Sequence, residues 1–164
     1  MSHSDLRLAE EIGNLLRSSG MTVSLAESCT GGMLGAILTS APGASDWFAG
    51  GVTAYSDLVK VSLLNVPEET IAEHGAVSRQ TAEAMASGIR ELTGTDLSLA
   101  VTGIAGPGGG SAEKPVGTVW MALCHADRVL AWRESFSGGR EVVRRDAADY
   151  LLRKLLLYLR EVGD

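Results

Sequence analysis

The sequence predicts an α/β fold, namely a three-layer α/β/α sandwich around a mixed five-stranded sheet. Three observations support this prediction: strand-like apolar segments alternate with helical ones, Gly-rich loops join several of them, and the last two strand-like segments are only three residues apart. Alternating strands and helices place helices on both faces of a sheet, whereas such a short connection joins an antiparallel pair. The 164 residues fit one domain, predicted to span 1–164.

In the first half of the chain, apolar spacing and turn residues predict three helices and two strands. Gly20 ends the first helix, and the adjacent Gly50 and Gly51 indicate a bulge in the second strand or a close approach to its backbone. In chain order, the expected elements are a helix over 4–18, a strand over 21–28, a helix over 33–40, a strand over 47–56 and a helix over 57–64.

The second half continues the alternation until the terminal hairpin and helix. Pro67 opens a helical turn that Gly75 closes, and Ser78 is the expected N-cap of the next helix. The following elements are a helix from Ser78 to about Leu92, strands over 96–106, 117–124 and 128–136, and a long helix over 140–162.

Composition and charge exclude several classes of protein. Two cysteines, Cys29 and Cys124, cannot build a disulfide framework, and no CxxC spacing suggests zinc or redox chemistry. No apolar run is long enough for a membrane span and no signal peptide is visible, so we expect a cytoplasmic protein without membrane partners. The formal net charge of −6 opposes binding to nucleic acid, whose phosphates need many lysine and arginine contacts.

Three loops carry candidate functional residues. In open α/β sheets, ligands bind at the carboxyl ends of strands. The candidate loops are "AESCTGG" at 26–32, the stretch between Ser45 and Lys60, and "TGIAGPGGGSAEKPVGT" at 102–118.

The third loop is long and rich in glycine. Its G-x-x-G-x-G spacing matches neither familiar phosphate motif, and a strand follows it instead of a helix. Two interpretations stay open: a binding loop whose backbone N–H groups surround an anion, or a mobile hairpin connection.

The first loop passes from a strand to a helix. The free N–H groups at a helix start can hold a phosphate, although Ser28 or Thr30 could equally be a simple N-cap. Cys29 could be a nucleophile, but the three histidines are scattered and none is an obvious base. A small buried residue is the favoured interpretation of Cys29.

Ser45 and Lys60 raise the possibility of nucleophilic catalysis. A serine hydroxyl needs a base, and a lysine can serve only if burial lowers its pKa from about 10.4 to about 7 or 8. Ser-Lys pairs are a known variant of serine hydrolase sites. From residue types alone, a solvated Lys60 on a helix face is the favoured interpretation, and a catalytic Lys60 is the alternative.

Four segments together resemble the CinA C-terminal domain family of nicotinamide-nucleotide amidohydrolases, in its stand-alone form. The resemblance runs from about residue 5 to 160 and is carried by "AESCTGG", "GASDWFAGGVTAYSDLVKVSLL", "HGAVSRQTAEAMA" and "VTGIAGPGGGSAEKPVGTVWMAL". It implies hydrolysis of nicotinamide mononucleotide to nicotinate mononucleotide and ammonia, a step of pyridine nucleotide salvage toward NAD, with no metal or other cofactor.

The resemblance also implies catalytic residues. The serine of a G-x-S-x-W-F segment is the implied nucleophile, here Ser45, and the lysine of Y-S-x-x-x-K is the implied base, here Lys60. Tyr55 could orient either through its hydroxyl, and backbone N–H groups of the long loop would stabilise the oxyanion. Asp46 next to Ser45 would raise the pKa of the lysine, unless its side chain points away.

For the 5′-phosphate we nominate the "SCTGG" segment with an arginine as the charged partner. Arg140 is placed first because it starts the last helix, ahead of Arg144 and Arg145. The substrate-binding residues expected from these arguments are Ser28, Thr30, Gly31, Thr102, Gly103, Gly106 and Arg140.

Two function classes remain to be separated. One is this amidohydrolase, with the mononucleotide as its partner and a homo-oligomer as the expected assembly. The other is a non-catalytic nucleotide-binding or regulatory module, in which Ser45 only caps a turn and Lys60 stays charged. A role in DNA uptake, suggested only by the family's name, is opposed by the net charge.

Overall fold

The structure is a computed structural model that describes residues 2–163, so the two end residues of the predicted domain, Met1 and Asp164, lie outside it. In chain order the elements are α1 (His3–Ser19), β1 (Val23–Glu27), α2 (Met33–Leu38), the 3₁₀ turn η1 (Ala44–Asp46), β2 (Phe48–Thr53), α3 (Asp57–Leu64), α4 (Glu68–His74), α5 (Arg79–Thr93), β3 (Leu97–Gly103), β4 (Thr118–His125), β5 (Arg128–Ser135) and α6 (Arg140–Val162).

The five strands form one mixed sheet in the order β2-β1-β3-β4-β5. β1 lies parallel to both β2 and β3, whereas β4 is antiparallel to β3 and to β5. The sheet and the terminal hairpin confirm the predicted mixed architecture. Because β1, β2 and β3 are parallel, the segments that follow them all begin at one edge of the sheet.

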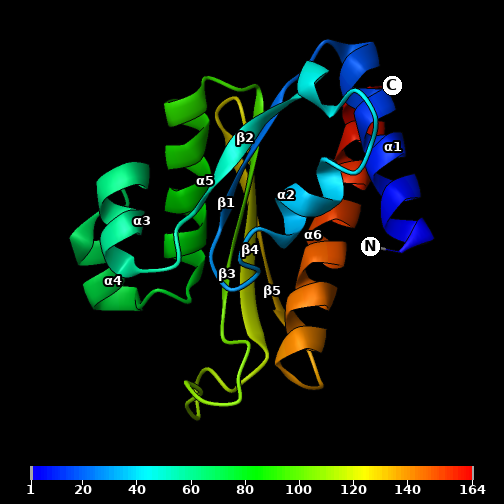
Figure 1. Ribbon diagram of the computed structural model, residues 1–164. Coiled ribbons are helices and arrows are strands. Elements are labelled where there is room, and N and C mark those ends of the chain that lie inside the picture. The colour runs from blue at the N-terminus through cyan, green and yellow to red at the C-terminus, as the bar shows by residue number, and fades with distance from the viewer. Residues whose placement is uncertain (1, 164) are drawn as a thin grey trace.

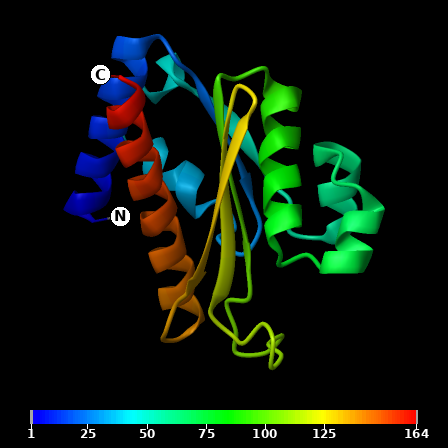
Figure 2. The same ribbon diagram turned by 180° about the vertical axis from the view of Figure 1, so that it is seen from behind.

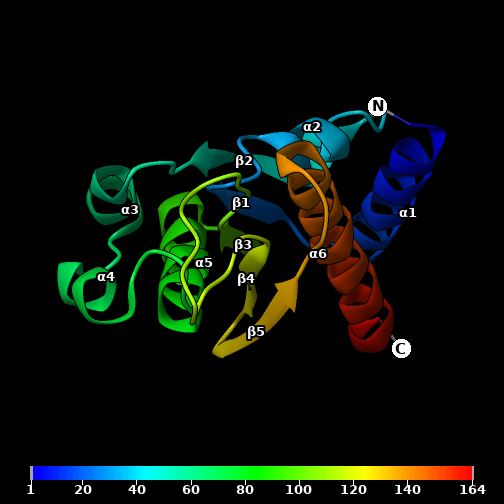
Figure 3. The same cartoon turned by 90° about the horizontal axis from the view of Figure 1, so that it is seen from below.

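Helices cover both faces of the sheet (Figure 1). Seen from below, α1, α2 and α6 lie on one side, while α5 lies on the other with α3 and α4 outside it (Figure 3). The view from behind shows the β4–β5 hairpin between α6 and α5 (Figure 2). Each face has its own apolar core, one around Leu25, Leu99 and Leu155 and the other around Met85 and Ile89. These layers confirm the predicted three-layer sandwich.

Gly50 and Gly51 in β2 mark a bulge and a close backbone approach, as the sequence predicts. The register with β1 shifts between Val23 and Ser24, so that Phe48 and Gly50 face successive residues and Ala49 is the extra residue of a bulge. A Cβ atom on Gly51 would lie 2.8 Å from the carbonyl oxygen of Leu25. The bulge and the close backbone approach are therefore both confirmed.

Several predicted helix ends are confirmed by their caps. Gly20 ends α1 in the left-handed region at φ 66°, and the Ser78 hydroxyl accepts a hydrogen bond from the Thr81 amide at the start of α5. Ser56 caps α3 in the same way through the Val59 amide. That cap fixes where α3 begins and therefore where Lys60 lies on it.

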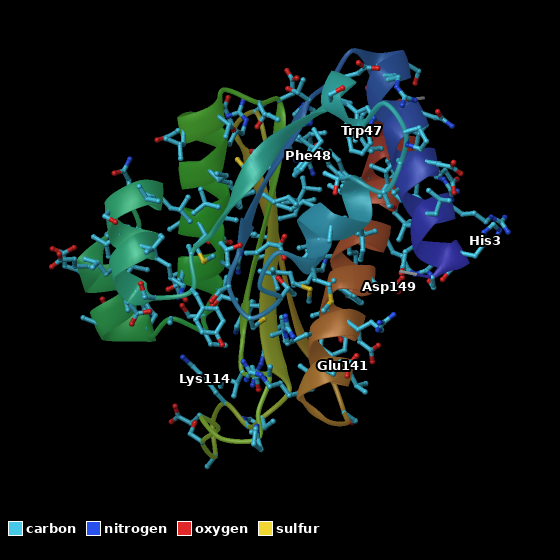
Figure 4. All side chains as sticks on the ribbon, in the orientation of Figure 1. His3, Trp47, Phe48, Lys114, Glu141 and Asp149 are labelled. Atoms are coloured by element: carbon cyan, nitrogen blue, oxygen red, sulfur yellow. The ribbon has the colours of Figure 1, made fainter. Side chains whose placement is uncertain are left out.

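The second strand is shorter than its predicted range, and this difference affects the site. Trp47 lies outside β2 because its ring is buried beside α1, where a Cβ atom on Gly13 would meet it at 2.8 Å. Figure 4 shows Trp47 close to α1, at the far end of β2 from α3. Within residues 2–163, no helix is long and apolar enough to cross a membrane.

Candidate active site

The carboxyl edge of the three parallel strands carries the candidate site. Ser28 directly follows β1, α3 follows β2 after a short connection, and the long Gly loop follows β3. Ser28 is held in place by its backbone, since its amide donates to the Val101 carbonyl of the neighbouring strand at 3.0 Å. The edge thus brings together segments that are distant in sequence.

Lys60 reaches Ser28 from the first turns of α3. Its Nζ donates hydrogen bonds to Ser28 Oγ at 3.3 Å, to the Ala54 carbonyl at 2.9 Å and to the Tyr55 carbonyl at 3.3 Å. The Lys60 side chain is only 1% exposed, and Ser28 is buried as well. The structure therefore contains a buried Ser-Lys pair, formed by Ser28 and Lys60.

Burial makes the Lys60 amine easier to deprotonate. Desolvation lowers its pKa below the ordinary lysine value, because the ammonium form loses more hydration than the neutral amine. The carboxylate of Asp57, with Oδ1 3.8 Å from Nζ, works in the opposite direction and raises the pKa. The net direction is downward, as a general base requires.

The structure corrects the predicted pairing of Ser45 with Lys60. Ser45 is exposed in η1, at the amino end of β2, whereas Lys60 follows the carboxyl end of that strand. In Figure 1, η1 lies at the top of the sheet and α3 lies far below it on the left. An extended six-residue strand, Phe48–Thr53, separates them, at about 3.3 Å per residue, so the two side chains cannot meet.

Asp46 is expected from the sequence to raise the pKa of Lys60 unless its side chain points away, and the same geometry places Asp46 far from Lys60. Asp46 Oδ2 lies 3.5 Å from Arg17 Nε, at the same distant end of β2 as Ser45. The carboxylate that acts on Lys60 is Asp57 instead. Trp47, which follows Asp46, is buried against α1 and not beside Lys60.

A cavity of about 270 Å³ opens onto the Ser28–Lys60 pair. Its charged lining groups are Asp57, Lys60 and Arg140. Within residues 2–163, no group of three His, Cys, Asp or Glu side chains is placed to hold a metal ion. The remaining lining residues are Ser28, Cys29, Tyr55, Ala76, Val77, Thr102, Gly103, Ile104, Ala105, Gly106, Gly108 and Gly109.

Arg140 is one of the residues that line this cavity. Its guanidinium donates to the Gly106 carbonyl at 2.7 Å and to the Tyr55 hydroxyl at 2.8 Å. The neighbouring Glu141, labelled in Figure 4, marks the end of α6 from which Arg140 reaches the loop. Tyr55 therefore contacts Lys60 through its carbonyl, and its hydroxyl contacts Arg140 rather than Lys60 or Ser45.

The predicted phosphate site at the start of α2 is already occupied by the protein itself. The buried carboxylate of Glu27 accepts hydrogen bonds from the amides of Gly32, Leu34 and Gly35. The Thr30 hydroxyl also donates to Glu27, at 2.6 Å. Thr30 and Gly31 lie outside the cavity lining, so the structure does not bring these two predicted ligands to the site.

The other two candidate arginines serve different contacts. Arg144 donates to the backbone carbonyls of Cys29 and Thr30, at 3.0 and 3.1 Å. Arg145 lies beside a separate depression lined also by Asp5 and Asp149. Of the three arginines weighed from the sequence, Arg140 is the one that lines the cavity.

Cys29, Thr102 and Gly103 complete the cavity floor. Burial raises the pKa of the Cys29 thiol to about 11, with the charge of Glu27 adding to the shift, so Cys29 is a poor nucleophile. The Thr102 hydroxyl donates to the Ala76 carbonyl at 2.8 Å. A Cβ atom on Gly103 would lie 3.1 Å from Cys29 Sγ, and this position therefore needs glycine for close packing.

Sequence reasoning missed Ser28 as the partner of Lys60, although a signal was present. Ser28 follows its strand, whereas Ser45 precedes its own. In a parallel sheet only residues after the strands gather at the ligand-binding edge. This rule favours Ser28 over Ser45 as the partner of Lys60, because Ser28 and Lys60 both follow a strand of the parallel part of the sheet.

Comparison with known proteins gives a family match over nearly the whole chain. The model of the CinA C-terminal domain matches residues 5–159. A nicotinamide-nucleotide amidohydrolase PncC of Shigella flexneri is 46% identical over 157 residues, covering 94% of this chain and 95% of that protein. A CinA-like protein of Desulfotalea psychrophila is 50% identical over 154 residues, but the match spans 37% of that longer protein and 93% of this chain.

Solved structures show the same fold. The crystal structure of competence/damage inducible protein CihA from Agrobacterium tumefaciens superposes with a TM-score of 0.92 at 39% sequence identity. The match covers 98% of each chain. The similarity therefore extends over every layer of the sandwich.

Proposed function

This chain belongs to the CinA C-terminal domain family, and we propose that it is a nicotinamide-nucleotide amidohydrolase. In this proposal it hydrolyses the carboxamide of nicotinamide mononucleotide to nicotinate mononucleotide and ammonia, a step of pyridine nucleotide salvage. The near full-length similarity to a protein of that name supports the substrate and the reaction. The observation that carries the chemistry is the buried Ser28–Lys60 pair at the base of a cavity.

The hydrogen-bond partners of Lys60 suit a neutral amine. A neutral amine has two N–H groups and one lone pair. The carbonyl oxygens of Ala54 and Tyr55 can accept the two N–H groups, which leaves the lone pair for the Ser28 hydroxyl. In that state the hydroxyl donates to the amine, and the serine is ready for activation.

In the first half of the reaction, Lys60 takes the proton of Ser28 Oγ as this oxygen bonds to the carboxamide carbon. The carbonyl electron pair moves onto oxygen and gives a tetrahedral oxyanion, which backbone N–H groups of the cavity loop, around Gly103 and Gly106, would stabilise. The C–N bond then breaks, and the Lys60 ammonium gives its proton to the leaving nitrogen. Ammonia departs and a nicotinoyl ester of Ser28 remains.

The second half returns the enzyme to its starting state. Lys60 takes a proton from a water molecule, whose oxygen bonds to the ester carbon. The C–Oγ bond then breaks, and Ser28 Oγ recovers its proton from Lys60. The product acid loses its own proton to solvent as nicotinate. One lysine thus serves as base and acid in both halves.

Arg140 is the proposed ligand of the 5′-phosphate. It is the guanidinium that lines the cavity, and arginine matches the geometry of phosphate oxygens. Thr102 lines the same cavity and is proposed to contact the substrate there. Homo-oligomer formation and a cytoplasmic location remain predictions, and the first is measured by light scattering of the purified protein.

The test is an ammonia-release assay with nicotinamide mononucleotide. We expect Ser28→Ala and Lys60→Met to lower kcat by about a thousandfold or more, because each removes one member of the pair. Ser45→Ala is the matched control: it removes the same hydroxyl from the other candidate serine and should retain the parent rate. Loss of activity in Ser45→Ala with retention in Ser28→Ala would reverse this assignment.

The rival function is a nucleotide-binding module without catalysis. It predicts that the parent protein binds the mononucleotide by calorimetry but releases no ammonia at any pH. Mass spectrometry adds an independent measurement, because a stalled nicotinoyl ester would add the acyl mass to Ser28. A parent that binds without turnover and without acylation would replace the amidohydrolase by the binding module.

A further inference from the structure

Glu27 is a buried carboxylate that faces only hydrogen-bond donors. Oε2 accepts from Thr30 Oγ1 at 2.6 Å and from the amides of Gly32 and Leu34, both at 3.1 Å. Oε1 accepts from the Gly35 amide at 2.9 Å. The residue is 4% exposed and directly precedes Ser28. One side chain therefore accepts from four donors in the segment that follows β1, residues 30–35.

Arg144 donates to two backbone acceptors of the same segment. Its Nε donates to the Cys29 carbonyl and one terminal nitrogen donates to the Thr30 carbonyl. A Cβ atom on Gly31 would lie 3.1 Å from that guanidinium, so the glycine leaves room for it, and its φ of 61° suits glycine as well. The two carbonyls are fixed by one planar group with two donors.

Neither Glu27 nor Arg144 lines the cavity, so neither meets the substrate directly. What both contact is the segment that directly follows Ser28, residues 29–35. A nucleophile must be held to a fraction of an ångström for an efficient attack, and a loop with consecutive glycines at positive φ does not supply that rigidity itself.

We infer that Glu27 and Arg144 form a clamp on residues 29–35, the segment that directly follows Ser28, and that this clamp positions Ser28 for attack. This inference rests on the proposed function, because it assigns Ser28 as the nucleophile. Glu27 and Arg144 are positioning residues, acting through the backbone of the loop. Loosening the clamp should therefore lower kcat and the intrinsic reactivity of Ser28 while leaving substrate affinity largely intact.

The first test replaces Glu27 by Gln, which has the same shape but turns an N–H₂ group toward donors that need an acceptor. We expect kcat to fall about tenfold to a hundredfold with KM changed less than about threefold. Labelling of Ser28 by a fluorophosphonate should slow by the same factor. Glu134→Gln is the matched control, since it removes a half-buried carboxylate that accepts from Tyr150, away from the cavity.

The second test keeps the inference falsifiable if Glu27→Gln fails to fold. Arg144→Ala should lose kcat in the same way, and added methylguanidine should restore part of it, because a free guanidinium can rebind the two carbonyls. Arg144→Lys should not match the parent, since an ammonium cannot present two parallel N–H groups. Arg153→Ala is the control, because Arg153 lies on the same helix and pairs with Asp149; it should leave kcat unchanged.

Three results would overturn the clamp. An active parent in which Glu27→Gln and Arg144→Ala keep both kcat and the rate of Ser28 labelling would refute the clamp alone. A parent that neither releases ammonia nor is labelled at Ser28 would refute the proposed function and the clamp together. Loss of thermal stability with unchanged kcat would also count against the clamp, because it would mark both residues as purely structural.

Discussion

Burial and a nearby carboxylate shift the pKa of the Lys60 amine in opposite directions. Desolvation lowers its pKa, and Asp57 at 3.8 Å raises it. Asp57 is more than half exposed, so solvent screens its charge, whereas the lysine has almost no contact with water. Burial therefore has the larger effect on the pKa of Lys60, and the Asp57 carboxylate only reduces the downward shift.

Replacing Asp57 by Asn tests this balance. Because only the neutral amine is a base, the rate rises with pH through the pKa of Lys60. Removing the carboxylate removes a cause that raises this pKa, so the rising limb should move to lower pH.

The measurement is a profile of kcat/KM against pH for parent and variant. Asp46→Asn makes the same change beside Arg17 and should leave the profile in place. A limb that moves to higher pH in Asp57→Asn would contradict the assignment of Lys60 as the titrating base.

At the scale of elements, the contact between α3 and α5 decides where Lys60 lies. A Cβ atom on Gly88 of α5 would lie 1.8 Å from the Leu64 carbonyl at the end of α3, closer than any two such atoms can pack. Glycine in mid-helix ordinarily costs stability relative to alanine, by about 1 kcal/mol. Here it lets α3 approach α5 and bring Lys60 under the sheet edge.

Gly88→Ala should therefore destabilise the protein although alanine is the better helix former. We expect a loss of about 1 to 3 kcal/mol in the free energy of unfolding, measured by urea denaturation, together with a lower kcat as α3 is displaced. Ser87→Ala, next to it on α5, is the control. A variant as stable as the parent would show that α3 moves aside freely.

The elements themselves were largely predictable, because their signals are local. Helix caps such as Ser78 and Gly20, the hairpin of the last two strands, and the bulge next to Gly50 depend on a few neighbouring residues. The pairing of Ser28 with Lys60 depends instead on which strands are neighbours in the sheet. Similarity of segments to a family placed the nucleophile at Ser45, on the wrong end of β2, and the spacing of Ser45 from Lys60 left that pairing possible.

Gly88 was missed for the same reason. Its requirement comes from the carbonyl of Leu64, on an element that no local pattern places beside it. The clamp on Ser28 was equally hidden, since Arg144 lies far along the chain from Cys29 and Thr30. The sequence could predict that a site lies at this edge of the sheet. The contacts within the site could not be predicted, because they depend on the complete fold.

At the scale of the whole molecule, charge governs which large partners are accessible. The net charge is −6, and the notable arginine cluster at the start of α6 is largely engaged within the protein. Arg140 bonds to Gly106 and Tyr55, and Arg144 bonds to two loop carbonyls. Both guanidinium groups are therefore already bonded within the protein, and the net negative charge opposes a duplex.

We therefore expect negligible binding to duplex DNA at about 150 mM salt. Fluorescence anisotropy of a labelled duplex, titrated with the parent protein, measures it. Binding that weakens steeply with added salt would reveal a basic surface and contradict this prediction.

The position of Arg140 has a consequence for how the protein matures in the cell. Among the residues that line the cavity, Arg140 is the last to leave the ribosome, and Arg144 follows it by one helical turn. A nascent chain can thus already hold its serine and lysine while its nucleotide pocket still lacks a guanidinium. The guanidinium proposed to bind the substrate phosphate is therefore the last part of the cavity lining to be synthesised.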